Sequence, residues 1–205
     1  MEAVDLQQEK ARLRRQFADR IAALDEASWN AASWCAGWRV RDVLAHLVKG
    51  AEMTYGSLTV DMLRGGFRPD RSVSKAATRL DAVSVPELAD RLRRAADRQF
   101  HLVGTAEAMG LVDVLVHSAD ALRPIGFEVD APPADAAPAL DALWKAGRMI
   151  VHATPQHGRR LVATDVDWSR GSGPEVRGEG IDLLLFVANR RQVLPKLEGA
   201  GVAGL

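Results

Sequence analysis

The sequence predicts a mainly α-helical protein: a four-helix bundle followed by a small α+β segment. Apolar residues recur at helical spacing in four stretches between residues 5 and 122, and caps or Pro/Gly breakers mark several of their ends. Two short β-prone stretches around a Gly/Ser-rich turn, both after residue 159, predict the mixed segment. A chain of 205 residues can bury a core as one domain, or as a larger and a smaller one.

The first two helices of the bundle are predicted from their apolar faces. Asp5 can cap the first helix, whose inner face carries Leu13, Phe17, Ile21 and Leu24. Residues 27–37 break the pattern and predict a connection, with Trp29, Trp34 and Trp38 as packing anchors. The second helix is expected over about 40–63 and ends at Gly65-Gly66.

The other two helices of the bundle follow a crossover connection expected over 67–83. Ser84-Val-Pro86-Glu87 is a capping box with proline in the first turn, which predicts the start of the third helix. The fourth helix is expected over about 108–122, where Pro124 stops it.

The domain organisation predicted from these elements has three parts. Residues 1–127 form the bundle, residues 128–139 form a proline-rich linker, and residues 140–205 form a small C-terminal domain packed on the bundle. In that domain we expect a helix from 140 to about 150, an antiparallel pair of strands at 160–164 and 175–177, and a last helix over 181–193. Two short strands do not fold alone, so the segment has to pack on another part.

The composition excludes several classes of function. Twenty-seven basic residues balance 27 acidic ones, so no net field attracts nucleic acid or an anionic membrane. The single cysteine, Cys35, excludes an internal disulfide, and the N-terminus is acidic where a signal peptide would be basic and then apolar. No apolar run reaches the ~18 residues that span a bilayer. We therefore expect a cytoplasmic protein, monomeric or homodimeric, with no nucleic-acid or membrane partner.

Three residues suggest a metal site. Asp113 and His117 are four apart, so on a helix their side chains leave the same face. His46 stands in an apolar helical stretch, where an imidazole needs a partner. If the two helices are neighbours, His46, Asp113 and His117 bind a divalent ion and leave a position open for water or substrate. The alternatives are a core histidine at 46 and a surface Asp–His pair. Asp42 either bonds the ring of His46 or is a solvated carboxylate in the first turn of its helix.

The sequence resembles the mycothiol-dependent maleylpyruvate isomerase family, whose metal-binding domain is a DinB-like four-helix bundle. Three stretches carry the resemblance: residues 34–47, residues 113–126 with their Asp113, His117 and Asp120, and residues 163–190 of the C-terminal segment. The family commonly has Glu where this chain has Asp113. Because aspartate is one methylene shorter, its carboxylate binds the metal either directly or through a water.

The resemblance implies a cofactor and a reaction. The expected metal is zinc, with iron or nickel as alternatives, and the expected thiol is mycothiol, which would act on a small electrophilic substrate. The activity implied is cis–trans isomerisation of maleylpyruvate to fumarylpyruvate, or thiol S-transfer. Cys35 would then be a buried, inert thiol. The alternatives are a non-catalytic DinB-like metal-binding or stress-response protein, and a bundle with histidines in its core.

The resemblance also suggests a substrate contact. Arg190 matches an arginine of the family's small domain and would bind a substrate carboxylate. The neighbouring Arg191 is an equal alternative, and both arginines can simply be surface charges. His152 and His157 fall in an expected loop, where a solvated role is favoured over a substrate contact.

Overall fold

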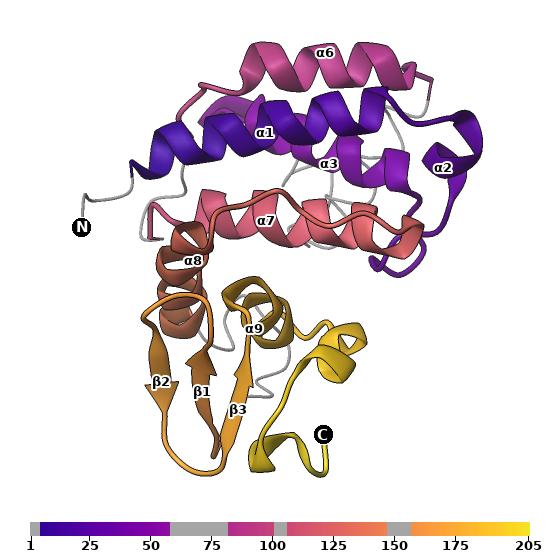
Figure 1. Ribbon diagram of the computed structural model, residues 1–205. Helices are drawn as coiled ribbons and strands as arrows, with labels where there is room; N and C mark the ends of the chain where they lie inside the picture. The colour runs from indigo at the N-terminus through magenta and orange to yellow at the C-terminus, as the bar shows by residue number, and fades with distance from the viewer. Residues whose placement is uncertain (1–4, 58–81, 101–105, 147–156) are drawn as a thin grey trace. The chain divides into compact units, whose positions relative to one another are not determined.

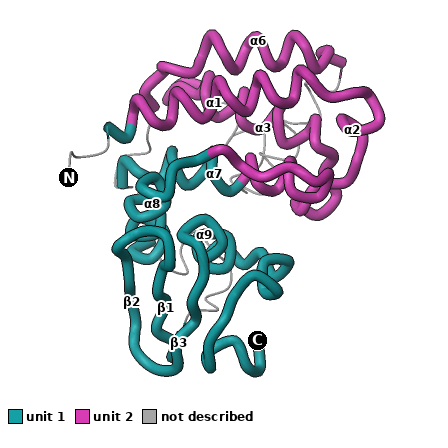
Figure 2. Tube along the Cα trace, in the orientation of Figure 1, with its two compact units in different colours: residues 1–6, 101–116, 131–205 teal, residues 7–100, 117–130 magenta. Residues whose placement is uncertain are grey.

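The computed structural model describes residues 5–57, 82–100, 106–146 and 157–205. The chain divides into two compact units (Figure 2). The helical unit consists of Gln7–Phe100 and His117–Asp130, and the mixed unit of Met1–Leu6, His101–Val116 and Ala131–Leu205. One continuous helix, α7 (Met109–Leu122), contributes residues to both units. Within the described ranges, no helix has the length and apolar character that a membrane span needs.

The helical unit contains helices at the positions that the apolar periodicity predicts (Figure 1). These are α1 (Leu6–Ala22), α3 (Val40–Ala51), α6 (Val85–Ala95) and the second half of α7. The predicted inner face of α1 is buried at Leu13, Phe17 and Ile21. The mainly helical fold class is thereby confirmed. A short helix, α2 (Glu26–Asn30), lies within the predicted connection.

Side chains at the helix ends explain where the helices begin. The Ser84 hydroxyl accepts a hydrogen bond from the backbone N–H of Glu87 at 3.4 Å, so the predicted cap of α6 is present. Helix α3 is capped differently: the Asp42 carboxylate accepts from the backbone N–H of Arg39 at 2.8 Å. Helix α3 packs against α6.

A buried arginine joins α1 to the end of α6. The side chain of Arg14 is on α1, and the residue is only 6% exposed. Its Nη1 donates to the carbonyl oxygens of Ala96, at 3.2 Å, and Arg98, at 3.3 Å. These carbonyls lie at and beyond the end of α6, where a helix leaves acceptors without intrahelical partners. Arg14 therefore supplies hydrogen-bond donors to carbonyl oxygens at the end of α6 that have no donor within the helix.

The helices differ in length from the sequence-based expectation. The apolar spacing from Leu88 onward predicts that the third helix includes Gln99 and Phe100, but α6 ends at Ala95. Helix α3 ends at Ala51. Residues 52–54 are not helical, so the predicted second helix is interrupted there. Its part from residue 58 on, the Gly65-Gly66 stop, and the crossover up to residue 81 fall outside the described residues.

In the described residues, the mixed unit combines the first half of α7 and two further α-helices with a three-stranded sheet. Helix α8 (Pro133–Ala146) packs against α9 (Gly180–Val187). Their approach is close at Gly180, where an added Cβ would lie 2.7 Å from the Cβ of Ala136. The sheet has the order β2-β1-β3, formed by β1 (Arg160–Ala163), β2 (Ser169–Gly171) and β3 (Glu175–Gly178). The Trp168 indole N–H donates to Asp141 of α8 at 2.9 Å and ties the start of β2 to that helix.

The strand pairing differs from the prediction. The segment 175–177 was expected to pair antiparallel with 160–164, but β3 pairs with β1 in parallel, and β2 is the antiparallel partner. The chain first reverses between β1 and β2, and then turns again through Gly171 (φ +86°) and Gly173 (φ +117°). This second turn brings β3 to the other edge of β1, with β3 running in the same direction as β1. Glycine accommodates both positive φ values without a steric penalty.

Two other predicted boundaries in this region also differ. Residues 133–139, expected in the linker, form the first half of α8. Pro133 is the first residue of the helix, where proline is tolerated, whereas Pro138 lies inside it. The last helix was expected to reach residue 193, but α9 ends at Val187. Asn189 then adopts a positive φ of 64°, and a 3-10 helix, Arg191–Lys196, follows.

Candidate metal site

Helix α7 carries a polar stripe on an otherwise buried surface. From Leu111 to Leu122, every residue is buried except Asp113 and His117, which are half-buried. Because they are four apart on one continuous helix, they project from the same face. A carboxylate oxygen of Asp113 lies within 4.8 Å of a ring nitrogen of His117. The two side chains paired by their sequence spacing therefore lie near each other, and their role as ligands stays a prediction.

His46 faces His117 within the helical unit. It is a half-buried residue of α3, with buried neighbours on both sides in the sequence. The centroids of the two imidazole rings are 4.5 Å apart, and the ring planes are inclined at 72°. A ring nitrogen of His46 lies within 4.8 Å of one of His117. The indole of Trp38 also contacts His46, with ring centroids 5.4 Å apart. His117 thus has both of its expected co-ligands as near neighbours.

The Asp42 carboxylate serves the start of α3. Besides the backbone N–H of Arg39, it accepts from the Arg39 guanidinium at 3.0 Å and 2.9 Å. Partial burial acts to raise the pKa of Asp42, but the hydrogen bonds from Arg39 and its positive charge outweigh this effect, so the pKa lies below its ordinary value. This arrangement favours the first-turn alternative for Asp42 over a bond to His46.

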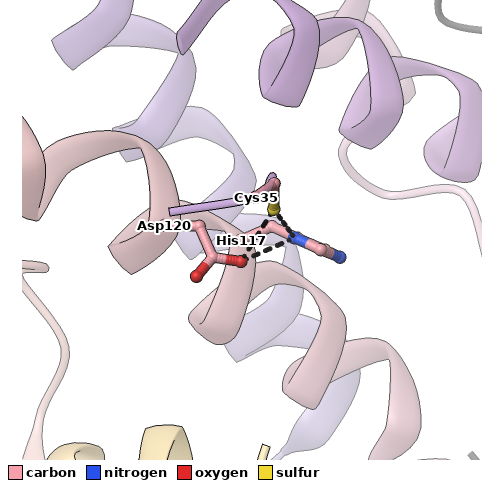
Figure 3. Close-up of side chains that lie close together, drawn as sticks. All are labelled: Cys35, His117 and Asp120. Carbon is pink, nitrogen blue, oxygen red and sulfur yellow. Dashed lines mark hydrogen bonds and ion pairs between the residues drawn. The ribbon is translucent and has the colours of Figure 1, made fainter. Parts of the chain in front are cut away.

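Two residues that were not predicted as ligands lie against His117 (Figure 3). His117 Nδ1 is 3.1 Å from Asp120 Oδ2 and 3.6 Å from Cys35 Sγ, and Sγ is 3.1 Å from Oδ2. Asp120 is fully buried, whereas Cys35 is half-buried. Cys35 is therefore less buried than expected, and its inertness stays a prediction. The spacing of His117 and Asp120, three apart on one helix face, could have indicated their contact, but Cys35 is far away in the sequence.

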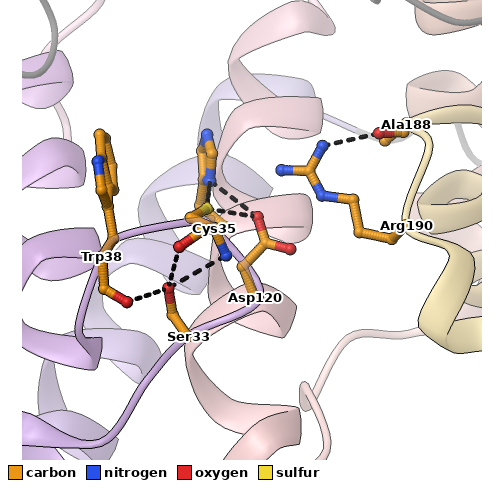
Figure 4. Close-up of polar contacts among 7 residues, drawn as sticks. Ser33, Cys35, Trp38, Asp120, Ala188 and Arg190 are labelled. Carbon is orange, nitrogen blue, oxygen red and sulfur yellow. Dashed lines mark hydrogen bonds and ion pairs between the residues drawn. The ribbon is translucent and has the colours of Figure 1, made fainter.

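A tight loop holds Cys35 in place (Figure 4). The backbone N–H of Trp38 donates to the Cys35 carbonyl at 2.9 Å, across a turn that contains Gly37 with φ +78°. The Ser33 hydroxyl accepts from the Cys35 N–H at 3.1 Å and donates to the Trp38 carbonyl at 2.9 Å. The N–H of Trp34 donates to the Asp120 carbonyl at 2.9 Å, which anchors the loop on α7. Backbone hydrogen bonds thus fix the thiol beside Asp120.

The family is identified by the segment that carries these side chains. A family model described as "Mycothiol maleylpyruvate isomerase N-terminal domain" matches residues 11–122, which is more than half of the chain. The chain belongs to this family. The resemblance noted in the sequence is thereby confirmed. The segment of this chain that matches the family model includes His46, Asp113 and His117, as well as Cys35 and Asp120.

Two solved structures share the fold of this family member. A crystal structure of the mycothiol-dependent maleylpyruvate isomerase has 18% sequence identity and a TM-score of 0.58. A histidine-to-alanine mutant of that enzyme has 16% identity and a TM-score of 0.59. Each comparison covers 96% of this chain and 93% of the other. Comparison with curated protein sequences finds no significant match. At these identities the likeness shows the fold.

The predicted substrate contact lies outside the segment matched by the family model. Arg190 is half-buried, and its guanidinium donates to the Ala188 carbonyl at 2.7 Å (Figure 4). Arg191 and His157 are exposed, and His152 falls outside the described residues. Arg190 is therefore the less exposed of the two arginines, and its contact with substrate stays a prediction.

Proposed function

We propose that this protein is a metal-dependent enzyme of the maleylpyruvate isomerase type, which uses mycothiol for cis–trans isomerisation or for thiol S-transfer. Family membership supports the class of protein. The observation that carries the proposal is the pair of facing imidazoles, His46 and His117, with Asp113 one turn before His117. We infer that these three residues bind the metal.

The donor set fits a catalytic divalent ion. Two imidazole nitrogens and one carboxylate are three protein ligands, which leave a position open to water or substrate. Zinc is the ion we expect, and iron or nickel suits the same donors. The half-burial of all three residues is consistent with an ion that a small molecule can reach. Asp113 binds either directly or through a water.

We assign supporting roles to Asp120, in orienting His117, and to Arg190, in binding the substrate. A proton on His117 Nδ1, donated to the buried Asp120 carboxylate at 3.1 Å, leaves the Nε2 lone pair for the metal and fixes the orientation of the ring. Arg190 binds a carboxylate of the substrate, for which the fork of guanidinium donors is suited. When bound, the metal and the thiol supply a thiolate that adds reversibly to the cis double bond, so that the bond can rotate.

The first experiment measures metal and thiol dependence. The protein is purified without a nickel column, its metal content is determined, and its thermal stability and its turnover of maleylpyruvate are measured with and without mycothiol. We expect bound metal, a rise in the melting temperature with mycothiol, and thiol-dependent turnover. Metal without any effect of thiol would support the non-catalytic alternative. Absence of metal would overturn the proposal.

The role of Arg190 has a matched control in the next residue. Arg190→Ala should raise KM for a carboxylate substrate, because it removes the bidentate partner, while metal content is unchanged. Arg191→Ala changes an exposed arginine one position along the chain and should leave KM unchanged. Equal effects of the two variants would contradict the role given to Arg190.

A further inference from the structure

We propose that Cys35, His117 and Asp120 form a second metal site, which contains sulfur and binds a thiophilic divalent ion such as zinc. The three side chains lie in the helical unit, and their donor atoms converge on one point (Figure 3). The proposed site shares His117 with the site of the proposed function, but it does not depend on the thiol chemistry proposed above. It assigns a purpose to the one cysteine of the chain.

The distances between the donors match a tetrahedral ion. With zinc bonds of about 2.3 Å to sulfur and about 2.0 to 2.1 Å to nitrogen and oxygen, tetrahedral geometry requires separations of about 3.6 Å for S to N, about 3.5 Å for S to O and about 3.3 Å for N to O. The structure has 3.6 Å, 3.1 Å and 3.1 Å for these pairs. Each differs from the required value by about 0.4 Å or less, which a small side-chain movement removes.

The chemistry of the donors selects the ion. A thiolate, an imidazole nitrogen and a carboxylate bring two negative charges, which neutralise a divalent cation in a largely buried place. Binding releases the thiol proton of Cys35 to solvent. With the first site empty, the ring proton of His117 moves from Nδ1 to Nε2 and the imidazole stays neutral; with an ion on Nε2, the Nδ1 proton is released as well and the ring bridges the two ions as an imidazolate. Cys35 and His117 are half-buried, so a fourth ligand can enter from solvent.

The surrounding loop holds the donors before any ion arrives. Asp120 is on α7 and Cys35 on the 33–38 loop, which the Trp34 N–H binds to the Asp120 carbonyl. The Ser33 hydroxyl and the turn at Gly37 fix the backbone on both sides of the thiol. A ligand set that is already in position loses less conformational entropy on binding.

X-ray absorption at the zinc edge tests the proposal. Because Cys35 is the only cysteine, a sulfur shell at about 2.3 Å from zinc in a buffer without thiols can come only from Cys35. We expect this shell in the full chain loaded with up to about two equivalents of zinc, and its loss in Cys35→Ser and in Cys35→Ala. An unchanged circular dichroism spectrum checks that both variants fold.

Two variants separate this site from the site of the proposed function. His46→Ala and Asp113→Asn remove ligands of the first site and should leave the sulfur shell in place. A shell of nitrogen and oxygen alone in the wild-type protein would overturn the proposal. Loss of the sulfur shell in His46→Ala would also overturn it, because the thiol would then belong to the ion held by His46. Either result leaves the test of thiol-dependent turnover unaffected.

Discussion

Replacing His46 by alanine in a Cys35→Ser background isolates the proposed histidine and aspartate site. The background removes the sulfur ligand of the second site, so that any stabilisation by zinc reports on His46, Asp113 and His117. In the wild-type ligand set, free zinc at about 100 times its Kd stabilises the folded protein by about 2.7 kcal/mol. For a chain of this length this amounts to about 5 to 11 °C in melting temperature. His46→Ala should abolish this rise.

The same substitution has a smaller effect without metal. The substitution removes the ring contacts of His46 with Trp38 and His117, each of which contributes about 0.5 to 1.5 kcal/mol to the free energy of unfolding. The higher helix propensity of alanine offsets about 0.5 kcal/mol of this loss. The metal-free variant should therefore unfold at a temperature about 1 to 10 °C lower, while it keeps its helical circular dichroism. The two effects are separated by scanning calorimetry of metal-free protein with and without added zinc.

A matched histidine variant controls for the loss of an imidazole. His157→Ala changes an exposed histidine of the mixed unit and should keep the full rise with zinc. The reasoning is refuted if His46→Ala shows the same rise as its Cys35→Ser parent, since zinc would then bind without the imidazole of α3.

Three further predictions follow from the same structure. Asp113→Glu should keep its metal and bind it as tightly or more tightly, because the added methylene extends the reach of the carboxylate; loss of metal in a competition titration would contradict this. Gly37→Ala should lower the free energy of unfolding in urea by about 1 to 2 kcal/mol, because alanine is strained at φ +78° although no atom lies within 4 Å of the added Cβ. Gly37→Asn should lower the free energy of unfolding by less, because asparagine tolerates this conformation better than alanine does. Equal losses in the two variants would count against the explanation. Asp42→Asn should cost about 0.3 to 1 kcal/mol near neutral pH, since it removes the negative charge that interacts with Arg39 and with the N-terminus of α3. Because folding lowers the pKa of Asp42, its stabilisation is complete above the unfolded value of about 3.9 and is lost as the pH falls through the folded value. The difference in unfolding free energy between the wild-type protein and Asp42→Asn should therefore shrink on acidification below about pH 4, and a constant difference would be evidence against the lowered pKa.

The sequence predicts the helices whose signals are local. Ser84 and Pro86 mark the start of α6 within one turn, and the spacing of Asp113 and His117 places both side chains on one face of α7. Such signals need only helical periodicity and the chemistry of a helix terminus. The pairing of His46 with His117 is proposed from the apolar setting of His46, and the resemblance to the isomerase family strengthens it.

The features missed by the prediction depend on contacts distant in the sequence. The approach of Cys35 to His117 and Asp120 follows from a turn at Gly37 and a hydrogen bond from Trp34 to α7, neither of which has a periodic signature. The parallel pairing of β3 depends on a second reversal at Gly171 and Gly173, so the Gly/Ser-rich turn was correctly located but assigned to the wrong pair of strands. In both cases a glycine sets the direction of the chain, whereas its consequence appears in tertiary contacts.

The guanidinium of Arg14 makes the middle of α1 and the end of α6 dependent on each other. If the last turn of α6 frays and the residues after Ala95 move away, Arg14 keeps its charge in a buried place but loses its two carbonyl acceptors. If α1 detaches, those carbonyls lose their donors at the same moment. Hydrogen exchange should consequently show the amides of the last turn of α6 opening together with those around Arg14, as one cooperative folding unit and not as an independently fraying end.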